Sequence, residues 1–112
     1  MQISELQVIL QATVLSGALK MDTAIERVVV SDILSDVMAK AGQGCLWVTG
    51  QTNVNVVAIA FFKGLAGVVL ADRLQLNGEA LAKAKEKEIP VLSSEWTAFQ
   101  IAGELYKFGL RG

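Results

Sequence analysis

Residues 45–53 read CLWVTGQTN, a short apolar run that ends in a cluster of small polar residues. Three other stretches repeat this pattern: RVVVSD at 27–32, GVVLADR at 67–73 and IPVLSSE at 89–95. Such runs are typical of strands that are buried on both faces, as in a parallel sheet. Each polar cluster opens a stretch of helical pattern, and this alternation predicts right-handed helical crossovers between parallel strands.

The pattern along the whole chain predicts one domain over residues 1–112 with an α/β fold. We expect a three-layer α/β/α arrangement around a mainly parallel central sheet of four or five short strands. The stretch 18–26 lacks periodicity and is predicted to be a loop. We expect helices over 3–10, 33–41, 54–62, 79–88 and about 95–108, and strands over 13–15, 27–31, 45–49, 67–70 and 89–92.

The composition is unusually apolar for a small domain. The chain has 112 residues, of which 53% are hydrophobic, and its mean hydropathy is +0.47. A domain of this size has a large surface relative to its volume, so one copy has little interior in which to bury so much apolar surface. We therefore expect part of that surface to be buried against a second copy, in a homodimer.

Several function classes are disfavoured by the charged and reactive residues. The net charge is −1 and histidine is absent, which removes the commonest general base and metal ligand. The lysines at 83, 85 and 87 alternate with acids, so no clustered basic face for nucleic acid is expected. The single cysteine, Cys45, lies within a predicted strand and is expected to pack as a small apolar residue. We predict no metal and no cofactor.

The N-terminal residues show no secretory signal, and the cytoplasm is the expected location. One stretch, 54–71, is long enough to raise the question of a membrane helix. It contains Asn55 and, near its middle, Lys63, followed by glycines at 64 and 67. A helix, a turn and a buried strand explain this stretch better, so we expect no membrane association.

The first candidate site is the polar cluster after the strand at 45–49. Ligands of open parallel sheets bind outside the carboxyl ends of the strands. Thr49, Gln51, Thr52 and Asn53 offer hydroxyls and amides there, beside a glycine and before a helix, a combination that can hold an anion or a polar small molecule. The alternative is an ordinary strand-to-helix turn in which Thr52 or Asn53 caps the helix. The glycine spacing excludes a P-loop.

Three residues of other clusters join this candidate ligand site: Ser31, Asp32 and Ser93. Asp32 and Asp36 have i,i+4 spacing on the second predicted helix and could hold a divalent cation with further ligands, but acids in a first turn more often complement the helix dipole. Ser93 opens a cluster that also suits a helix cap. No catalytic residue is predicted, because no acid in the sequence is shown to be buried or paired as a general base requires.

The predicted helix over 54–62 is apolar almost all round, interrupted only by Asn55. Such a helix is either deeply buried or shared with a partner chain. We predict that it forms the dimer interface, through the residues Val54, Val57, Ala58, Phe61 and Phe62.

Four segments carry a resemblance to a known family: 29–38, 46–55, 63–69 and 89–94, together with the aromatic C-terminal helix. Over nearly the whole chain the sequence resembles the DRTGG domain family. The resemblance implies a fold similar to the N-terminal domain of HPr kinase/phosphorylase, without the kinase active site. It also implies a regulatory or oligomerising homodimer, since related domains occur alone, joined to CBS domains, or within some phosphotransacetylases. A partner enzyme or kinase of the same pathway would be its target.

The chain departs from the family in the motif that gives the family its name. Around residues 22–28, Asp22 stands at the aspartate position, Thr23 at the arginine position, and Arg27 and Val28 at the two glycines. The family also often carries a histidine near Asn53, which is absent here. The leading hypothesis is thus a non-catalytic regulatory module. The alternative is a domain that senses a small molecule, such as a nucleotide, at the carboxyl ends of the strands.

Overall fold

Five strands form one sheet in the order β1-β5-β4-β3-β2 in the computed structural model, which describes all of residues 1–112. The strands are β1 (Thr13–Ser16), β2 (Arg27–Val30), β3 (Cys45–Thr49), β4 (Gly67–Leu70) and β5 (Val91–Ser93). The helices are α1 (Ile3–Leu10), α2 (Leu34–Lys40), α3 (Val54–Lys63), α4 (Gly78–Glu86) and α5 (Ala98–Lys107), with a short 3-10 helix, η1 (Ala18–Lys20), in the predicted loop.

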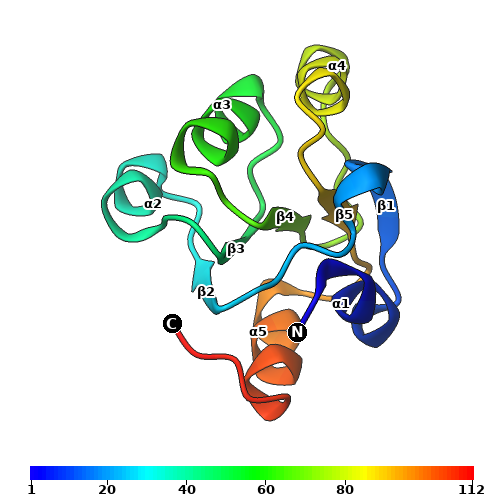
Figure 1. The fold of residues 1–112 in the computed structure, drawn as a ribbon, viewed down its shortest axis with the longest axis vertical. Coiled ribbons are helices and arrows are strands. Elements are labelled where there is room, and N and C mark those ends of the chain that lie inside the picture. The colour runs from blue at the N-terminus through cyan, green and yellow to red at the C-terminus, as the bar shows by residue number, and fades with distance from the viewer.

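The sheet is mainly parallel, as predicted. Strands β2 to β5 lie side by side in chain order and are parallel, while β1 pairs antiparallel with β5 at one edge. Helices α2, α3 and α4 cover one face of the sheet, and α1 and α5 cover the other (Figure 1). The three-layer α/β/α architecture is therefore confirmed.

The side chains of β3 alternate between two apolar cores. Cys45 and Trp47 point into the core beneath α2, α3 and α4. Leu46 and Val48 point into the core beneath α1 and α5. All four side chains are completely buried, as expected of a central strand with both faces covered.

Two helices bury a narrower face than their sequences suggest. In and beside α2, Val37 and Ala41 are buried, but Ile33 and Met38 are exposed, although all four belong to one apolar pattern. Helix α2 covers the edge strand β2 and has a helical neighbour, α3, on one side only. In α5, Phe99 is 87% exposed. None of the helices is long and apolar enough to cross a membrane, and the stretch 54–71 divides into α3, a turn and β4.

A tight approach of two chain segments fixes β1 against β5. Gly17 follows β1 with a φ of +77°, and a Cβ atom on it would collide with the backbone of Pro90. Beside it, the Ser16 hydroxyl donates a hydrogen bond of 2.6 Å to the carbonyl oxygen of Ile89. Only glycine meets both the dihedral and the space requirement at position 17.

We predict opposite effects for two glycine-to-alanine substitutions. Gly17→Ala should lower the free energy of unfolding by more than about 1 kcal/mol, because it adds both strain and a backbone clash. Gly103→Ala, in α5 where a Cβ would meet nothing within 4 Å, should raise it by about 0.5–1 kcal/mol. Urea denaturation of both variants measures the difference. Equal effects would contradict the close approach at Gly17.

Candidate functional site

The polar clusters after β2 and β3 meet at one edge of the sheet, as the sequence predicts. One carboxylate oxygen of Asp32 accepts hydrogen bonds from the Thr49 hydroxyl at 2.8 Å and from the Gly50 N–H at 2.6 Å. The Gln51 side-chain amide donates to the Asp32 carbonyl oxygen at 3.1 Å. Asp32 therefore joins the loop before α2 to the loop before α3.

The remaining members of the 49–53 turn form the N-terminal cap of α3. The Asn53 side-chain oxygen accepts from the Asn55 N–H at 2.9 Å, so Asn53 is the cap residue. Its side-chain amide donates to the Gln51 side-chain oxygen at 3.3 Å. Thr52 caps nothing; instead its carbonyl oxygen accepts from the Asn77 N–H at 3.3 Å, which links the turn to the start of α4. The polar groups of the turn are thus largely bonded to one another.

Ser31 and Asp32 lie before α2 rather than on it. The Ser31 hydroxyl accepts from the Ile33 N–H at 3.0 Å, and its carbonyl oxygen accepts from the Trp47 indole N–H at 2.8 Å. Because α2 begins at Leu34, Asp32 precedes the helix, and Asp36 lies in its first turn, where an acid complements the helix dipole. No group of three or more acidic or sulfur ligands is close enough to hold a metal ion.

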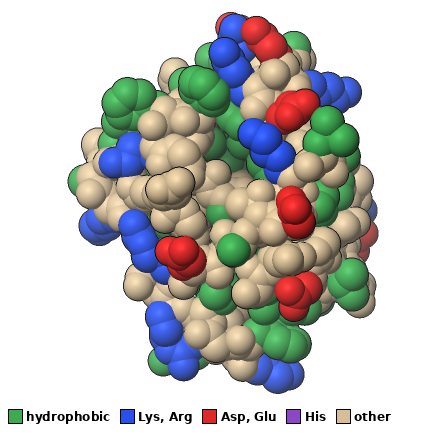
Figure 2. Space-filling view, viewed as in Figure 1, with side chains coloured by type: hydrophobic (Ala, Val, Ile, Leu, Met, Phe, Trp, Pro, Cys, Tyr) green, Lys and Arg blue, Asp and Glu red, His purple; other side chains and the backbone are tan.

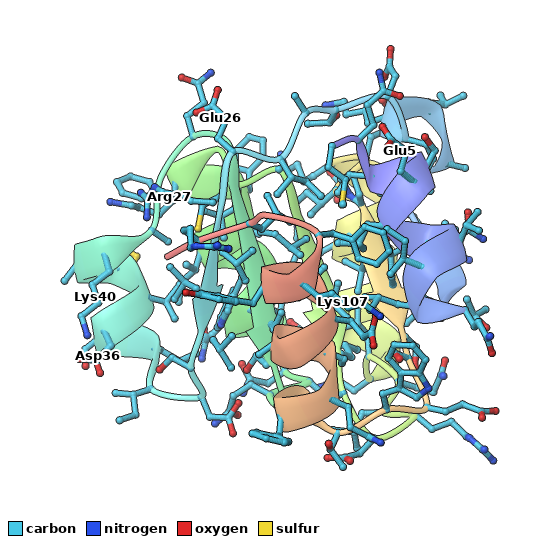
Figure 3. All side chains as sticks on the ribbon, turned by 90° about the horizontal axis from the view of Figure 1, so that it is seen from below. Glu5, Glu26, Arg27, Asp36, Lys40 and Lys107 are labelled. Carbon is cyan, nitrogen blue, oxygen red and sulfur yellow. The ribbon has the colours of Figure 1, made fainter.

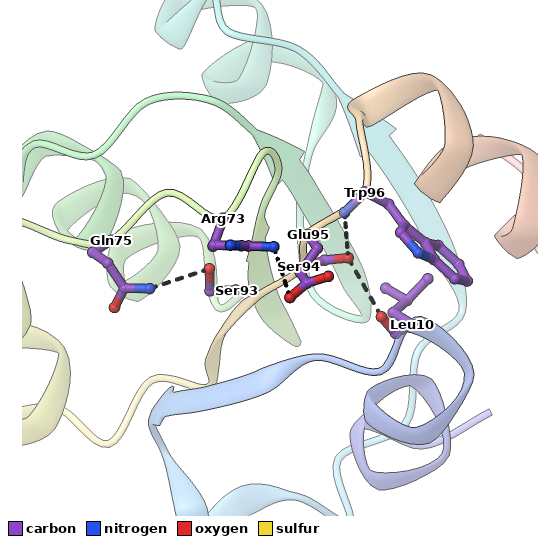
Figure 4. Close-up of polar contacts among 7 residues, drawn as sticks. All are labelled: Leu10, Arg73, Gln75, Ser93, Ser94, Glu95 and Trp96. Carbon is purple, nitrogen blue, oxygen red and sulfur yellow. Dashed lines mark hydrogen bonds and ion pairs between the residues drawn. The ribbon is translucent and has the colours of Figure 1, made fainter.

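Ser93 belongs to a second cluster, at the ends of β4 and β5 (Figure 4). Its hydroxyl donates to the Leu74 carbonyl oxygen at 2.7 Å and accepts from the Gln75 side-chain amide at 3.4 Å. The neighbouring Ser94 hydroxyl donates to the Leu10 carbonyl oxygen at 3.4 Å and accepts from the Trp96 N–H at 3.1 Å. Ser93 thus shares no hydrogen bond with the 49–53 turn, and it is not a helix cap; the cap of α5 is Thr97.

The loop after β4 contains a feature that the sequence does not signal. Asp72 and Arg73 both have positive φ, 57° and 60°, without being glycine. Their N–H groups donate to the carbonyl oxygens of Trp96 at 2.9 Å and Ser94 at 2.7 Å. The Arg73 guanidinium also forms an exposed ion pair of 2.9 Å with Glu95. The β5–α5 loop therefore holds this turn in a left-handed conformation.

A groove on the surface lies between α3 and α4 and begins at Val54, directly after the 49–53 turn. It has a volume of about 220 Å³ and is lined by Val54, Val57, Ala58 and Phe61, with Lys83 and Lys87 on the α4 side. Figure 2 shows hydrophobic side chains at the bottom of the hollow between these helices and basic side chains along α4. The Lys87 ammonium lies 4.7 Å from the centre of the Phe61 ring, a cation–π contact.

The predicted interface residues of α3 divide between core and surface. Val57 is only 2% exposed and packs in the core, so it offers little area to a partner chain, although it contributes to the lining of the α3–α4 groove. Val54 is half-buried and Ala58 is exposed. Phe61 and Phe62 are 57% and 76% exposed, which is unusual for side chains of this size. These exposed residues leave α3 with an apolar surface that the chain does not cover.

The single cysteine has no feature of a reactive thiol. Cys45 is fully buried in the core beneath α2 and α3. Burial raises the pKa of its thiol above the ordinary value, and the positive charge of Arg27 counters only part of this rise. The group is therefore a neutral thiol at pH 7, and it packs as a small apolar side chain.

We predict that Asp32 stabilises the fold more than its neighbour Asp36. Asp32→Ala removes an acceptor that holds the Thr49 hydroxyl and the Gly50 N–H, and should lower the free energy of unfolding by about 1–3 kcal/mol. Asp36→Ala removes an acid in the first turn of α2 that forms no ion pair, and should cost at most about 1 kcal/mol. Urea denaturation measures both. A smaller loss for Asp32→Ala than for Asp36→Ala would show that the Asp32 contacts contribute little.

Comparisons with known proteins identify relatives of this fold. No curated protein matches the sequence. Among solved structures, the chain is similar to the CBS and DRTGG domains of the regulatory region of Clostridium perfringens pyrophosphatase, complexed with the activator diadenosine tetraphosphate. The TM-score is 0.78 at 13% sequence identity, over 93% of this chain and 45% of that one, so the chain spans less than half of that structure. The family model of the DRTGG domain matches residues 5–108, and the chain therefore belongs to the DRTGG domain family.

Proposed function

We propose that this chain is a single non-catalytic regulatory module that assembles as a homodimer through α3. The observation that carries the proposal is the exposed apolar surface formed by Ala58, Phe61 and Phe62 beside the α3–α4 groove. Burying such side chains against a second copy would remove apolar area from water, at about 25 cal/mol per Å². An exposed apolar patch on an otherwise well-packed domain commonly marks a surface for protein association.

The charges beside the groove are compatible with pairing of two copies. Helix α4 carries Glu79, Lys83 and Glu86, and Lys87 follows it directly; Lys83 already lies 3.3 Å from Glu86. In a two-fold contact, each residue that touches a second position is touched by that position in return. A lysine of one copy can therefore meet a glutamate of the other, and the lysines need not face one another.

The regulatory role is supported by the kind of protein in which the fold recurs. The similar structure is described as part of the regulatory region of a pyrophosphatase. We propose that this module likewise acts on an enzyme or kinase, as a separate protein or as another part of the same polypeptide. The carboxylates near the strand ends take part in local contacts: Asp32 accepts from Thr49 and Gly50, and Glu95 forms an exposed ion pair with Arg73.

We predict that Ala58→Glu and Phe62→Glu each convert the dimer to a monomer without unfolding the chain. Both positions are exposed in one copy, so a glutamate there stays in water until a second copy would cover it. Light scattering at micromolar concentration gives the mass, and far-ultraviolet circular dichroism reports the fold. Phe99→Glu is the matched control, because Phe99 is equally aromatic and exposed but lies on α5 at the opposite face.

The unmodified chain must form a dimer, and Phe99→Glu must leave that dimer intact. A monomeric native chain, or a dimer that only Phe99→Glu dissociates, would show that α3 is not the interface.

The second candidate function is sensing of a nucleotide or similar polar molecule at the 49–53 turn. It is favoured by the nucleotide named in the description of the pyrophosphatase regulatory region. It is disfavoured by the turn itself, where Thr49, Gln51 and Asn53 already bond to one another and to Asp32. A ligand would have to replace these contacts, at a loss comparable to its own new hydrogen bonds.

We accordingly predict no thermal stabilisation by AMP, ATP or diadenosine tetraphosphate. A ligand present at about a hundred times its Kd would add about 2.7 kcal/mol to the free energy of unfolding, a shift that a melting curve detects readily. Such a shift, abolished by Gln51→Ala but kept in Gln75→Ala, would establish the 49–53 turn as a binding site and overturn this expectation.

A further inference from the structure

The groove between α3 and α4 is small and suits an apolar side chain. Its volume of about 220 Å³ lies below the range of about 300–1,000 Å³ that is usual for the binding sites of small molecules. Its α3 wall consists of Val54, Val57, Ala58 and Phe61. On the α4 side, Lys83 and Lys87 border it with their aliphatic stems, since lysines keep their ammonium groups in water. A single apolar side chain therefore fits this groove better than a polar ligand.

Phe62 is an exposed aromatic side chain on the same helix that does not line the groove. It is 76% exposed, whereas its neighbour Phe61 forms part of the groove wall. Successive residues of an α-helix are about 100° apart, so Phe62 lies about 40° to one side of Ala58 and Phe61 about 60° to the other. Because Phe61 faces α4, Phe62 projects outward and away from α4. It cannot fill the groove of its own copy.

The symmetry of a closed dimer selects Phe62 as the side chain that fills the groove. In a two-fold dimer the same surface of both copies forms the contact, so an inserted side chain and its groove must lie on one face of the chain. Phe62 meets this condition, because it shares α3 with the groove. Phe99 belongs to α5, on the opposite face of the sheet. Its insertion into the groove of another copy would leave the assembly open and extend it into a chain of copies.

Mutual insertion also determines the direction in which the two α3 helices pack. A two-fold axis roughly along α3 turns the Phe62 side of one helix toward the groove side of the other. An axis across α3 would instead bring the two Phe62 sides together. Asn55 lies on that side as well, about 60° from Ala58, and its amide would be covered without a partner. The two α3 helices therefore run in the same direction.

The charges of α2 and α4 are compatible with this arrangement. Helices α2 and α4 flank α3, so α2 of one copy comes nearest to α4 of the other. Asp36 and Lys40 lie on the outer side of α2, away from the sheet (Figure 3), and neither forms an ion pair within its own copy. Helix α4 carries Lys83 and Glu86. Each sign of charge on α2 therefore has an opposite charge available on α4 of the other copy.

We propose that Phe62 of each copy inserts into the α3–α4 groove of the other copy. This inference rests on the dimer proposed above and specifies how its two copies hold each other. The ring leaves water and lies next to the partner's Phe61, and a pair of aromatic rings in contact is stabilised beyond the burial of their area. Each dimer contains two such insertions, one in each direction.

Two substitutions remove the two parts of this contact separately. Phe62→Ala removes the inserted side chain and leaves the groove open. Lys83→Trp keeps Phe62 but fills the groove from the α4 side. Each should weaken dimerisation at least about thirtyfold in sedimentation equilibrium, because a central aromatic side chain carries much of the energy of a contact. Lys85→Trp is the matched control, since Lys85 is exposed on the same helix but does not line the groove, and it should leave the dimer intact.

Mixing the two weakened variants tests the insertion directly. The Phe62→Ala copy keeps an open groove and the Lys83→Trp copy keeps Phe62, so a mixed dimer regains one insertion that neither variant forms with itself. We expect the mixed dimer to form about tenfold more tightly than either homodimer, measured by energy transfer between fluorescent labels on the two variants. Circular dichroism reports whether each variant is folded.

The outcomes separate this inference from the dimer itself. A native dimer that Ala58→Glu dissociates, but whose weakened variants gain nothing on mixing, would overturn the insertion and leave the α3 interface standing. A monomeric native chain would overturn both. Phe62→Ala truncates an exposed side chain and leaves the core unchanged. Native affinity in this variant would therefore overturn the insertion even if Lys83→Trp does not fold.

Discussion

The constraint on which this structure depends is that its three parallel crossovers lie on one face of the sheet. Strands β2 to β5 follow one another in chain order, and α2, α3 and α4 pack side by side above them. Parallel sheets form a ligand crevice where successive crossovers diverge to opposite faces. No such point exists between β2 and β5. The carboxyl ends of the strands therefore adjoin one continuous helical layer, and their polar side chains bond to neighbouring loops. Asp32 makes the hydrogen bonds that hold one polar cluster together, and Ser93 makes those that hold the other.

Because of this constraint, the surfaces that the chain leaves uncovered lie on the outer side of the helical layer and at its end. Side-by-side helices leave grooves between them, and the α3–α4 groove is one of these. The layer ends at α2, which covers β2 from one face but does not pair with its backbone. On the outer side of this layer, Phe61 and Phe62 of α3 are exposed.

The sequence predicted the positions of the helices and strands better than it predicted which of their side chains are buried, and the reason is physical. The apolar runs mark β2 to β5 because a strand with both faces covered must be apolar throughout. In α3 almost every residue is apolar, so no periodicity separates Val57, which faces the core, from Ala58, which faces solvent. The contact of Asp32 with Thr49 depends on the register of β2 against β3, in which Val30 pairs with Val48. That register is a property of the assembled sheet. The left-handed turn at Asp72 and Arg73 has no local signal either, since carbonyl groups of the β5–α5 loop hold it.

The apolar surface of α3 decides which force would act across a contact there. The α3 surface is apolar, so association there is driven by removal of side chains from water and strengthens or persists as salt is added. Helices α2 and α4 pack against α3 on its two sides, and Val37 and Ala41 of the α2 region share a core with α3, so the helix that would carry the contact is held in place before any second copy arrives.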